Sequence, residues 1–335
     1  MISRLLRSSR DYPYMYARVS AKKAKLLEER DYEDLIKMEP NQIAKRLEEG
    51  DYKEEIDELG ARYEGTDLIE LALNRNLVNS MHELIEMAPE TLSEIINVYL
   101  RRFDILTLKR VLRAKEVGEE EAARDLLMPM NRYSFSELET MMEGSYKDLV
   151  EKISFPDSEV DYRKYIEGED LLDVETGLDR AYTEELSLLC QKTGSSQFND
   201  FIKSEIDHQN IITALRLKKY GYNAEEVREH LLNGEEDAIV NELMSSGSLE
   251  EAIGVLSEAR DRDYPERLED VEHRLEVERL RNALRMLHAE PLGATSILGY
   301  IVAKRTEVKN LRMLARARET KVQNPETIRS NLVIP

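Results

Sequence analysis

The sequence predicts an all-α fold, and three observations carry that prediction. Glycine and proline are scarce, with 14 and 9 among 335 residues, and long stretches consist of Leu, Glu, Lys, Arg, Ala and Met, which are strong helix formers. No stretch alternates apolar and β-branched residues with polar ones over the length of a strand. A twelve-residue helical pattern also occurs three times, at intervals of about a hundred residues. We therefore expect helices throughout and a repeating unit of domain size.

The repeated pattern, called the signature below, begins at Asp104, Asp207 and Glu307. An acid opens each copy, a small polar residue follows at offset three, and basic residues stand at offsets nine and eleven. Spacings of 103 and 100 residues exceed the roughly 20–50 residues of stacked repeats, so the unit is a domain. Apolar residues at offsets four, seven and eight share one helical face and predict a buried stripe: Leu108, Val111 and Leu112; Ile211, Ala214 and Leu215; Leu311, Leu314 and Ala315.

Proline and glycine delimit the helices before the first signature. A basic helix is expected to begin near Pro13, because proline fits a first helical turn. Asp104 either caps a new helix or lies inside a continuous one, and the pattern leaves both open. The expected ranges after the basic helix are 31–38, 40–49, 53–62, 67–87 and 90–116.

A similar tail follows each signature and sets the phase of the repeat. Each tail is a turn and then a short helix with an acidic start, as the helix dipole favours. The tails end near Pro129, Gly234 and Pro335. We therefore predict three domains, 1–129, 130–233 and 234–335, of which the first is longer by the basic N-terminal helix.

Charge and composition exclude several classes of function. The formal net charge is −20, which argues against nucleic-acid binding, because that binding depends on Lys and Arg neutralising phosphates. No apolar run reaches the roughly 18–20 residues that cross a bilayer, and the single cysteine, Cys190, allows no internal disulfide and fits a reducing cytoplasm. The start of the chain is basic, but four residues there predict a packed helix rather than an organelle transit peptide: Tyr12, Tyr14, Tyr16 and Val19.

No motif for catalysis, cofactor or metal binding is found in the sequence. Phosphate-binding glycine loops are missing, and the His82-Glu83 pair lacks the second histidine of a zinc site. The acid-rich stretch 157–179 lacks the order of a calcium loop, which favours a solvated surface. Cys190 is expected to be a buried cysteine, and His208 a histidine on a helix surface. We expect no catalytic residue, no cofactor, no metal and no small-molecule substrate.

The arginines at offset nine, Arg113, Arg216 and Arg316, are the one candidate site. Each can simply be a cation that the C-terminal half of a helix favours. Alternatively, three domains related by an approximate threefold would gather these arginines around one axis, where they could bind an acidic partner. The sequence does not decide between these interpretations.

The order and spacing of these features resemble a known family. The carrying segments are Tyr14 to Val19, Arg102 to Lys115, Glu205 to Lys218, and Tyr300 to Arg316. They resemble the C subunit of the archaeal-type (A-type) and bacterial vacuolar-type (A/V-type) rotary ATP synthases, the counterpart of the d subunit of eukaryotic vacuolar ATPases. The resemblance covers nearly the whole chain.

The resemblance implies a non-catalytic central-stalk subunit in ion-driven ATP synthesis or hydrolysis. Members of the family are funnel-shaped, with three similar helical domains around a pseudo-threefold axis. The implied partners are the central shaft and the membrane proteolipid ring, so the chain would lie peripherally at the cytoplasmic face and reach the membrane through protein partners. A soluble helical-repeat adaptor is the alternative, although no period of 34–47 residues is found, and an α-helical enzyme is a third hypothesis.

Overall fold

The computed structural model describes residues 12–124, 127–166, 171–232, 238–289, 293–320 and 324–335. Every regular element within these residues is a helix, which confirms the all-α prediction. The helices are α2 (Tyr12–Lys23), α3 (Glu29–Leu35), α4 (Pro40–Glu48), α5 (Lys53–Leu59), α6 (Gly65–Met87), α7 (Glu90–Val117), α8 (Glu120–Arg124), α9 (Phe135–Glu143), α10 (Tyr146–Lys152), the 3-10 turn η1 (Tyr162–Lys164), α11 (Leu171–Thr193), α12 (Ser196–Lys219), α13 (Ala224–Glu229), α14 (Ala238–Ser245), α15 (Leu249–Arg260), α16 (Leu268–Ala289), α17 (Ala294–Glu319) and α18 (Pro325–Asn331).

Three pairs of consecutive long helices dominate this order: α6 with α7, α11 with α12, and α16 with α17. Short helices precede each pair, and one short helix follows it, namely α8, α13 or α18. The second helix of each pair carries a signature. Helices α13 and α18 begin after asparagine caps, since Asn223 and Asn324 accept hydrogen bonds from the backbone of the following turn.

The chain forms two compact units. Unit 1 comprises Leu108–Glu120 and Glu139–Arg279, and unit 2 comprises Arg4–Thr107, Glu121–Leu138 and Leu280–Pro335, as far as the structure describes these ranges. Residues 1–11, which include Met1–Ser3 of unit 1 and the start of unit 2, lie outside the described residues. The unit boundaries fall inside α7, α8, α9 and α16. The division into domains 1–129, 130–233 and 234–335 is a different one, and it stays a prediction.

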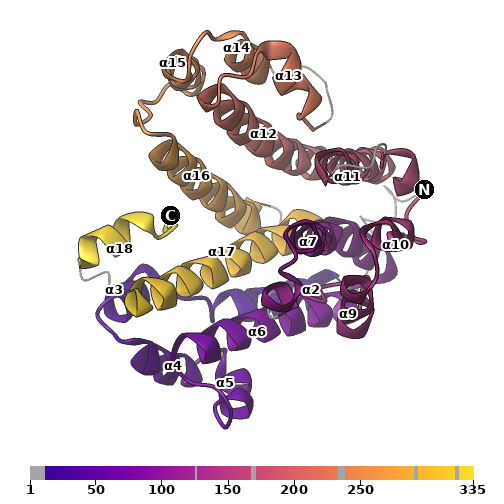
Figure 1. Cartoon of the computed structure of the whole chain (residues 1–335). Helices are drawn as coiled ribbons and strands as arrows, with labels where there is room; N and C mark the ends of the chain where they lie inside the picture. The colour runs from indigo at the N-terminus through magenta and orange to yellow at the C-terminus, as the bar shows by residue number, and fades with distance from the viewer. Residues whose placement is uncertain (1–11, 125–126, 167–170, 233–237, 290–292, 321–323) are drawn as a thin grey trace. The chain divides into compact units, whose positions relative to one another are not determined.

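Unit 2 is built around the contact between α6 and α17, which lie side by side (Figure 1). Helices α4 and α5 pack on α6, and α2 packs on α17. The approach of α16 to α17 is close at Gly299, where an added Cβ would lie 2.6 Å from the carbonyl oxygen of Ala283. Glycine at this position therefore lets the two backbones meet.

Unit 1 has its own apolar core, in which α12 packs against α14 and α15. Its fully buried side chains come from helices with one apolar face. They include Ile211, Leu215, Leu243, Leu256 and Val271.

The first two signature helices end at glycines with positive φ. Gly118 has φ 73° and Gly221 has φ 82°, backbone angles that residues other than glycine rarely adopt. At the second glycine the amides of Gly221 and Tyr222 donate to Lys218 and Leu217, which is the Schellman end of a helix. Helix α7 is continuous, so Asp104 lies inside it and does not cap a new helix.

The packed N-terminal helix is only partly as expected. Val19 and Met15 are each 1% exposed, so α2 does bury an apolar face. Tyr14, in contrast, is 58% exposed, and the expectation that it packs was wrong because its position directly before Met15 places it outside the stripe that Met15 and Val19 form. The side chain of Tyr12 lies outside what the structure describes.

Candidate functional site

The apolar stripe of each signature is core. All nine side chains at offsets four, seven and eight have 0% exposure, as the period of 3.6 residues predicts. This fixes the rotation of α7, α12 and α17, so that the remaining signature residues project at equivalent places along their helices.

Each signature arginine forms a two-pronged ion pair with a glutamate on another long helix. The Nε and Nη2 atoms of the guanidinium donate to the two carboxylate oxygens, the geometry that suits arginine best. The pairs are Arg113 with Glu175 (2.6 and 2.6 Å), Arg216 with Glu272 (2.6 and 2.8 Å) and Arg316 with Glu70 (2.9 Å for Nη2, with a second, shorter contact from Nε).

The arginines are surface residues, and their glutamates are more buried. The side chains of Arg113, Arg216 and Arg316 are 63%, 58% and 54% exposed. The hydrogen bond to the partner glutamate raises the pKa of each guanidinium above its ordinary value. Because exposed ion pairs contribute little to stability, these contacts orient the arginines more than they hold the fold together. The geometry agrees with locally paired arginines, and a role in partner binding stays a prediction.

The partner helices follow a regular order. Helix α7 pairs through its arginine with α11, α12 with α16, and α17 with α6. Each signature helix thus meets the first long helix of the next pair, and the third meets that of the first. The paired helices run antiparallel, because the contact one turn before the arginine on one helix lies one turn after the glutamate on the other: Lys109 contacts Asp179 (2.6 Å), and Arg312 contacts Asn74. On α12 and α16 the same direction follows from His208, two turns before Arg216, which lies 3.2 Å from Glu276, one turn after Glu272.

The small polar residue at offset three binds the end of its own tail. The hydroxyl of Thr107 donates to the carbonyl of Met128 (3.3 Å). The amide of Asn210 donates to the carbonyl of Leu232 (2.9 Å) and accepts from its N–H (2.8 Å). Asn310 makes the same two bonds with Val333, at 2.9 and 2.9 Å.

The first and third signature acids hold backbone N–H groups. Asp104 accepts from the amides of Asn131 (3.2 Å) and Arg132 (3.0 Å), and burial raises the pKa of this carboxyl to about 7. Glu307 accepts from the amide of Leu27 at 2.6 Å. Asp207 is half-buried.

Glu307 is also the centre of a buried polar network in unit 2. It accepts from the Tyr52 hydroxyl (2.6 Å) and from Lys304 (3.0 Å), whose side chain has 0% exposure and also lies 3.2 Å from Asp51. Lys304 lies 4.1 Å from the centre of the Tyr52 ring, which adds a cation–π contact. The buried charges are therefore paired and hydrogen-bonded, as their desolvation requires.

The histidines, the cysteine and the acidic residues that the sequence analysis considered have contacts of the kind that support the fold. His82 lies 3.0 Å from the carbonyl of Met130, and His208 lies 3.2 Å from Glu276, so it is a half-buried histidine with a partner on α16. Cys190 is half-buried, and burial raises the pKa of its thiol to about 11. The acid-rich stretch was misjudged in part, because Glu175 and Asp179 on α11 are partners of the first signature's basic residues.

Across the described residues no cluster of His, Cys, Asp and Glu could hold a metal ion. Neither the glutamates that pair with the arginines nor the burial of Lys304 was identified from the sequence. A signal for the partners did exist, since Glu70, Glu175 and Glu272 each lie four or five residues into a long helix. None of the helices that the structure describes is long and apolar enough to span a bilayer.

Comparison with known proteins gives the family. The model of the ATP synthase (C/AC39) subunit family matches residues 15–330. The chain is 32% identical to the C subunit of the A-type ATP synthase of Methanococcoides burtonii, with 98% of this chain and 95% of the relative covered. It is 33% identical to that of Haloquadratum walsbyi (93% and 96% covered) and 32% identical to that of Haloferax volcanii (96% and 97% covered). The chain therefore belongs to the ATP synthase (C/AC39) subunit family.

Proposed function

We propose that this chain is a non-catalytic part of an A-type ATP synthase and couples the central rotor shaft to the membrane proteolipid ring. The observation that carries the proposal is similarity over nearly the whole chain to proteins named as the C subunit of A-type ATP synthases. Helices held together by buried stripes and paired charges suit a part that transmits torque, because packed interiors deform little. In this role the protein lies peripherally at the cytoplasmic face and reaches the membrane through its protein partners.

We also propose that residues 1–129, 130–233 and 234–335 are three copies of one helical domain in a pseudo-threefold arrangement. Three kinds of contact support this at equal offsets in each signature: the bond to the tail, the ion pair of the arginine, and the buried stripe. The short helix after each signature adds a fourth common element.

The experiment for the function is co-purification from native membranes. A tagged chain extracted in mild detergent should bring down the nucleotide-binding head, the shaft and the proteolipid ring in fixed proportions. Recovery of the chain alone, or with unrelated proteins only, would overturn the proposed role and favour the adaptor hypothesis.

Arg113, Arg216 and Arg316 form the proposed partner interface, and their glutamates provide a matched control. Replacing all three arginines by alanine should weaken shaft binding, because guanidinium groups orient and attract a carboxylate surface. Replacing Glu70, Glu175 and Glu272 by glutamine frees the same arginines from their ion pairs and should preserve or strengthen binding. Equal loss in both variants would mean that the ion pairs position helices and that the arginines do not touch the shaft.

A further inference from the structure

Helices α7 and α17 each hold two backbone sites through the residues at the opening position and at offset three of their signatures. Helix α7 holds Met128 through Thr107 and Asn131 through Asp104. These two held residues lie three apart in one continuous segment, which leads from the first proposed domain into the second. The junction between the second and third domains falls at residues 233–237, outside the described residues.

The third signature helix makes the same contacts with segments from opposite ends of the chain. Helix α17 holds Val333 through Asn310 and the amide of Leu27 through Glu307. Leu27 precedes α3 as Asn131 precedes α9. On α7, both held residues thus belong to one continuous segment, whereas on α17 they belong to two segments, one around Leu27 and one around Val333.

We propose that residues 12–28 are a strap that closes a non-covalent junction between the third and the first domain. The inference rests on the proposed three domains and goes beyond the coupling role. The strap comprises α2, the basic helix by which the first proposed domain is longer than the other two, and the turn that carries Leu27 to Glu307. It gives the chain one junction that can open and close without unfolding a helix.

The strap binds elements of both domains that it would join. Toward the first, Lys22 pairs with Glu83 of α6 (2.5 Å) and Lys25 with Asp51 (3.0 Å). Toward the third, α2 packs on α17. The apolar part of the contact is firm, since Met15 and Val19 of the strap are buried, whereas its ion pairs reach the surface and are weakened by salt.

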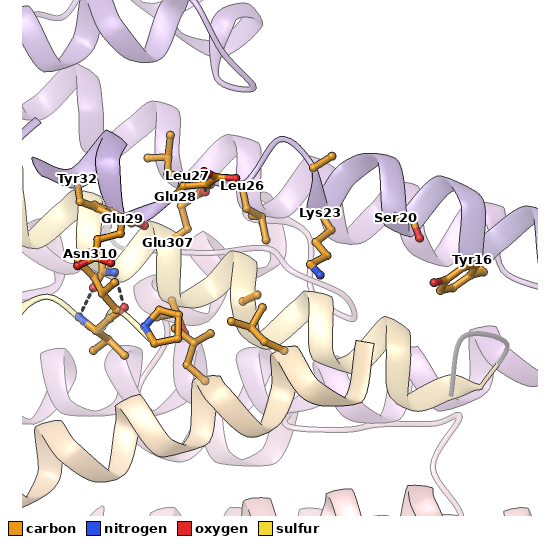
Figure 2. A pocket seen from close by; sticks show the side chains of 18 residues that line it. Tyr16, Ser20, Lys23, Leu26, Leu27, Glu28, Glu29, Tyr32, Glu307 and Asn310 are labelled. Atoms are coloured by element: carbon orange, nitrogen blue, oxygen red, sulfur yellow. Dashed lines mark hydrogen bonds between the residues drawn. The ribbon is translucent and has the colours of Figure 1, made fainter. Parts of the chain in front are cut away.

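A cavity lies between the segment around Leu27 and the segment around Val333, which no peptide bond joins directly. It measures about 660 Å³ and lies in unit 2. Figure 2 shows α2 and the turn after it along one side of the cavity, with Glu307 and Asn310 facing it from α17. Leu26 from the strap and Pro335 from the end of the chain line the same cavity. The two segments that would be continuous in the other junction thus approach one another here.

Hydrogen exchange of the full chain tests the strap, because the amide of Leu27 reports directly on the closed junction. Glu307→Gln keeps a weaker acceptor and removes the charge that faces Lys304 and Leu27. We expect exchange at Leu27 to rise by about tenfold or more, as loss of a charge-assisted bond implies. Asp104→Asn is the matched control at pH 8, above the pKa of about 7 that burial gives this carboxyl. It should raise exchange at Asn131 and Arg132 by less, because covalent neighbours keep them in place.

A second variant keeps Glu307 with its partners Tyr52 and Lys304 and removes two ion pairs of the strap, one of which ends on Asp51. Lys22→Ala with Lys25→Ala should raise exchange in residues 12–28 and in α17, while the core helix α12 of unit 1 keeps its protection. Lys53→Ala, which breaks an exposed ion pair with Asp57 inside α5, should change neither segment.

The outcomes separate the strap from simpler accounts. Unchanged exchange in α17 after the double lysine variant would mean that α2 only covers a surface, and would overturn the proposal. So would equal effects of Glu307→Gln and Asp104→Asn at their own junctions, or an even rise over both units. Co-purification with the synthase is scored independently, so failure of the strap and failure of the proposed function remain distinguishable.

Discussion

Asn210→Ala tests the contact between a signature helix and its own tail. The Asn210 side chain is 7% exposed and makes two hydrogen bonds to the backbone of Leu232, which is itself 8% exposed. Alanine removes both bonds and leaves a buried N–H and a buried C=O without these partners. Leaving one such group unsatisfied costs about 1–3 kcal/mol, so we expect the free energy of unfolding of unit 1 to fall by about 2–4 kcal/mol.

The first signature suggests an intermediate variant. Thr107 makes one bond to its tail where asparagine makes two, so Asn210→Thr should recover about half of the loss. Asn331→Ala is the control, because its amide makes an exposed bond within its own helix and should cost less than about 0.5 kcal/mol.

Urea unfolding followed by far-ultraviolet circular dichroism measures these differences, since the chain has no tryptophan to serve as a fluorescent probe. The midpoint should fall while the dependence on urea stays constant, because the surface exposed on unfolding is unchanged. A loss below about 0.5 kcal/mol for Asn210→Ala, or no difference between alanine and threonine, would refute the argument that these bonds fasten the tail.

Two glycines inside helices should respond in opposite directions to alanine. Gly299→Ala places a Cβ 2.6 Å from a carbonyl oxygen of α16 and should cost about 1–3 kcal/mol. Gly254→Ala meets nothing within 4 Å and should stabilise α15 by about 0.5–1 kcal/mol; thermal unfolding of both variants decides, and shifts of the same sign would contradict the close approach of α16 to α17. Burial raises the pKa of Asp104 to about 7, so between about pH 4 and pH 7 the folded state keeps a proton that the unfolded chain has lost. This group's contribution to the free energy of unfolding therefore falls as the pH rises, by at most about 1.4 kcal/mol per pH unit. Asp104→Asn should lack this pH dependence in urea unfolding at pH 5 and pH 8. The same change in stability between the two pH values for the variant and the unchanged protein would contradict this assignment. Replacing the three signature arginines by alanine should flatten the salt dependence of shaft binding while the circular dichroism spectrum stays unchanged, and unaltered affinity across a salt series would leave them as helix-end cations.

The helices and the faces that they bury follow from the sequence alone. Scarcity of glycine and proline and a period of 3.6 residues are local properties, so the fold class follows from them directly. The nine stripe residues are all buried for the same reason. Even the tail contacts had a local signal, because the small polar residue at offset three recurs in every signature.

The helix that each signature contacts becomes known only from the folded chain. Periodicity reports that a face is buried and carries no information about the partner, which here lies 62, 56 or 246 residues away in the chain. The acid-rich stretch illustrates the limit, since Glu175 looks like a solvated carboxylate until α7 brings Arg113 against it. Glu307 and Leu27 are 280 residues apart, and their bond depends on how helices from both ends of the chain pack. Such contacts are set by the sum of many packing choices, and no single segment of sequence contains them.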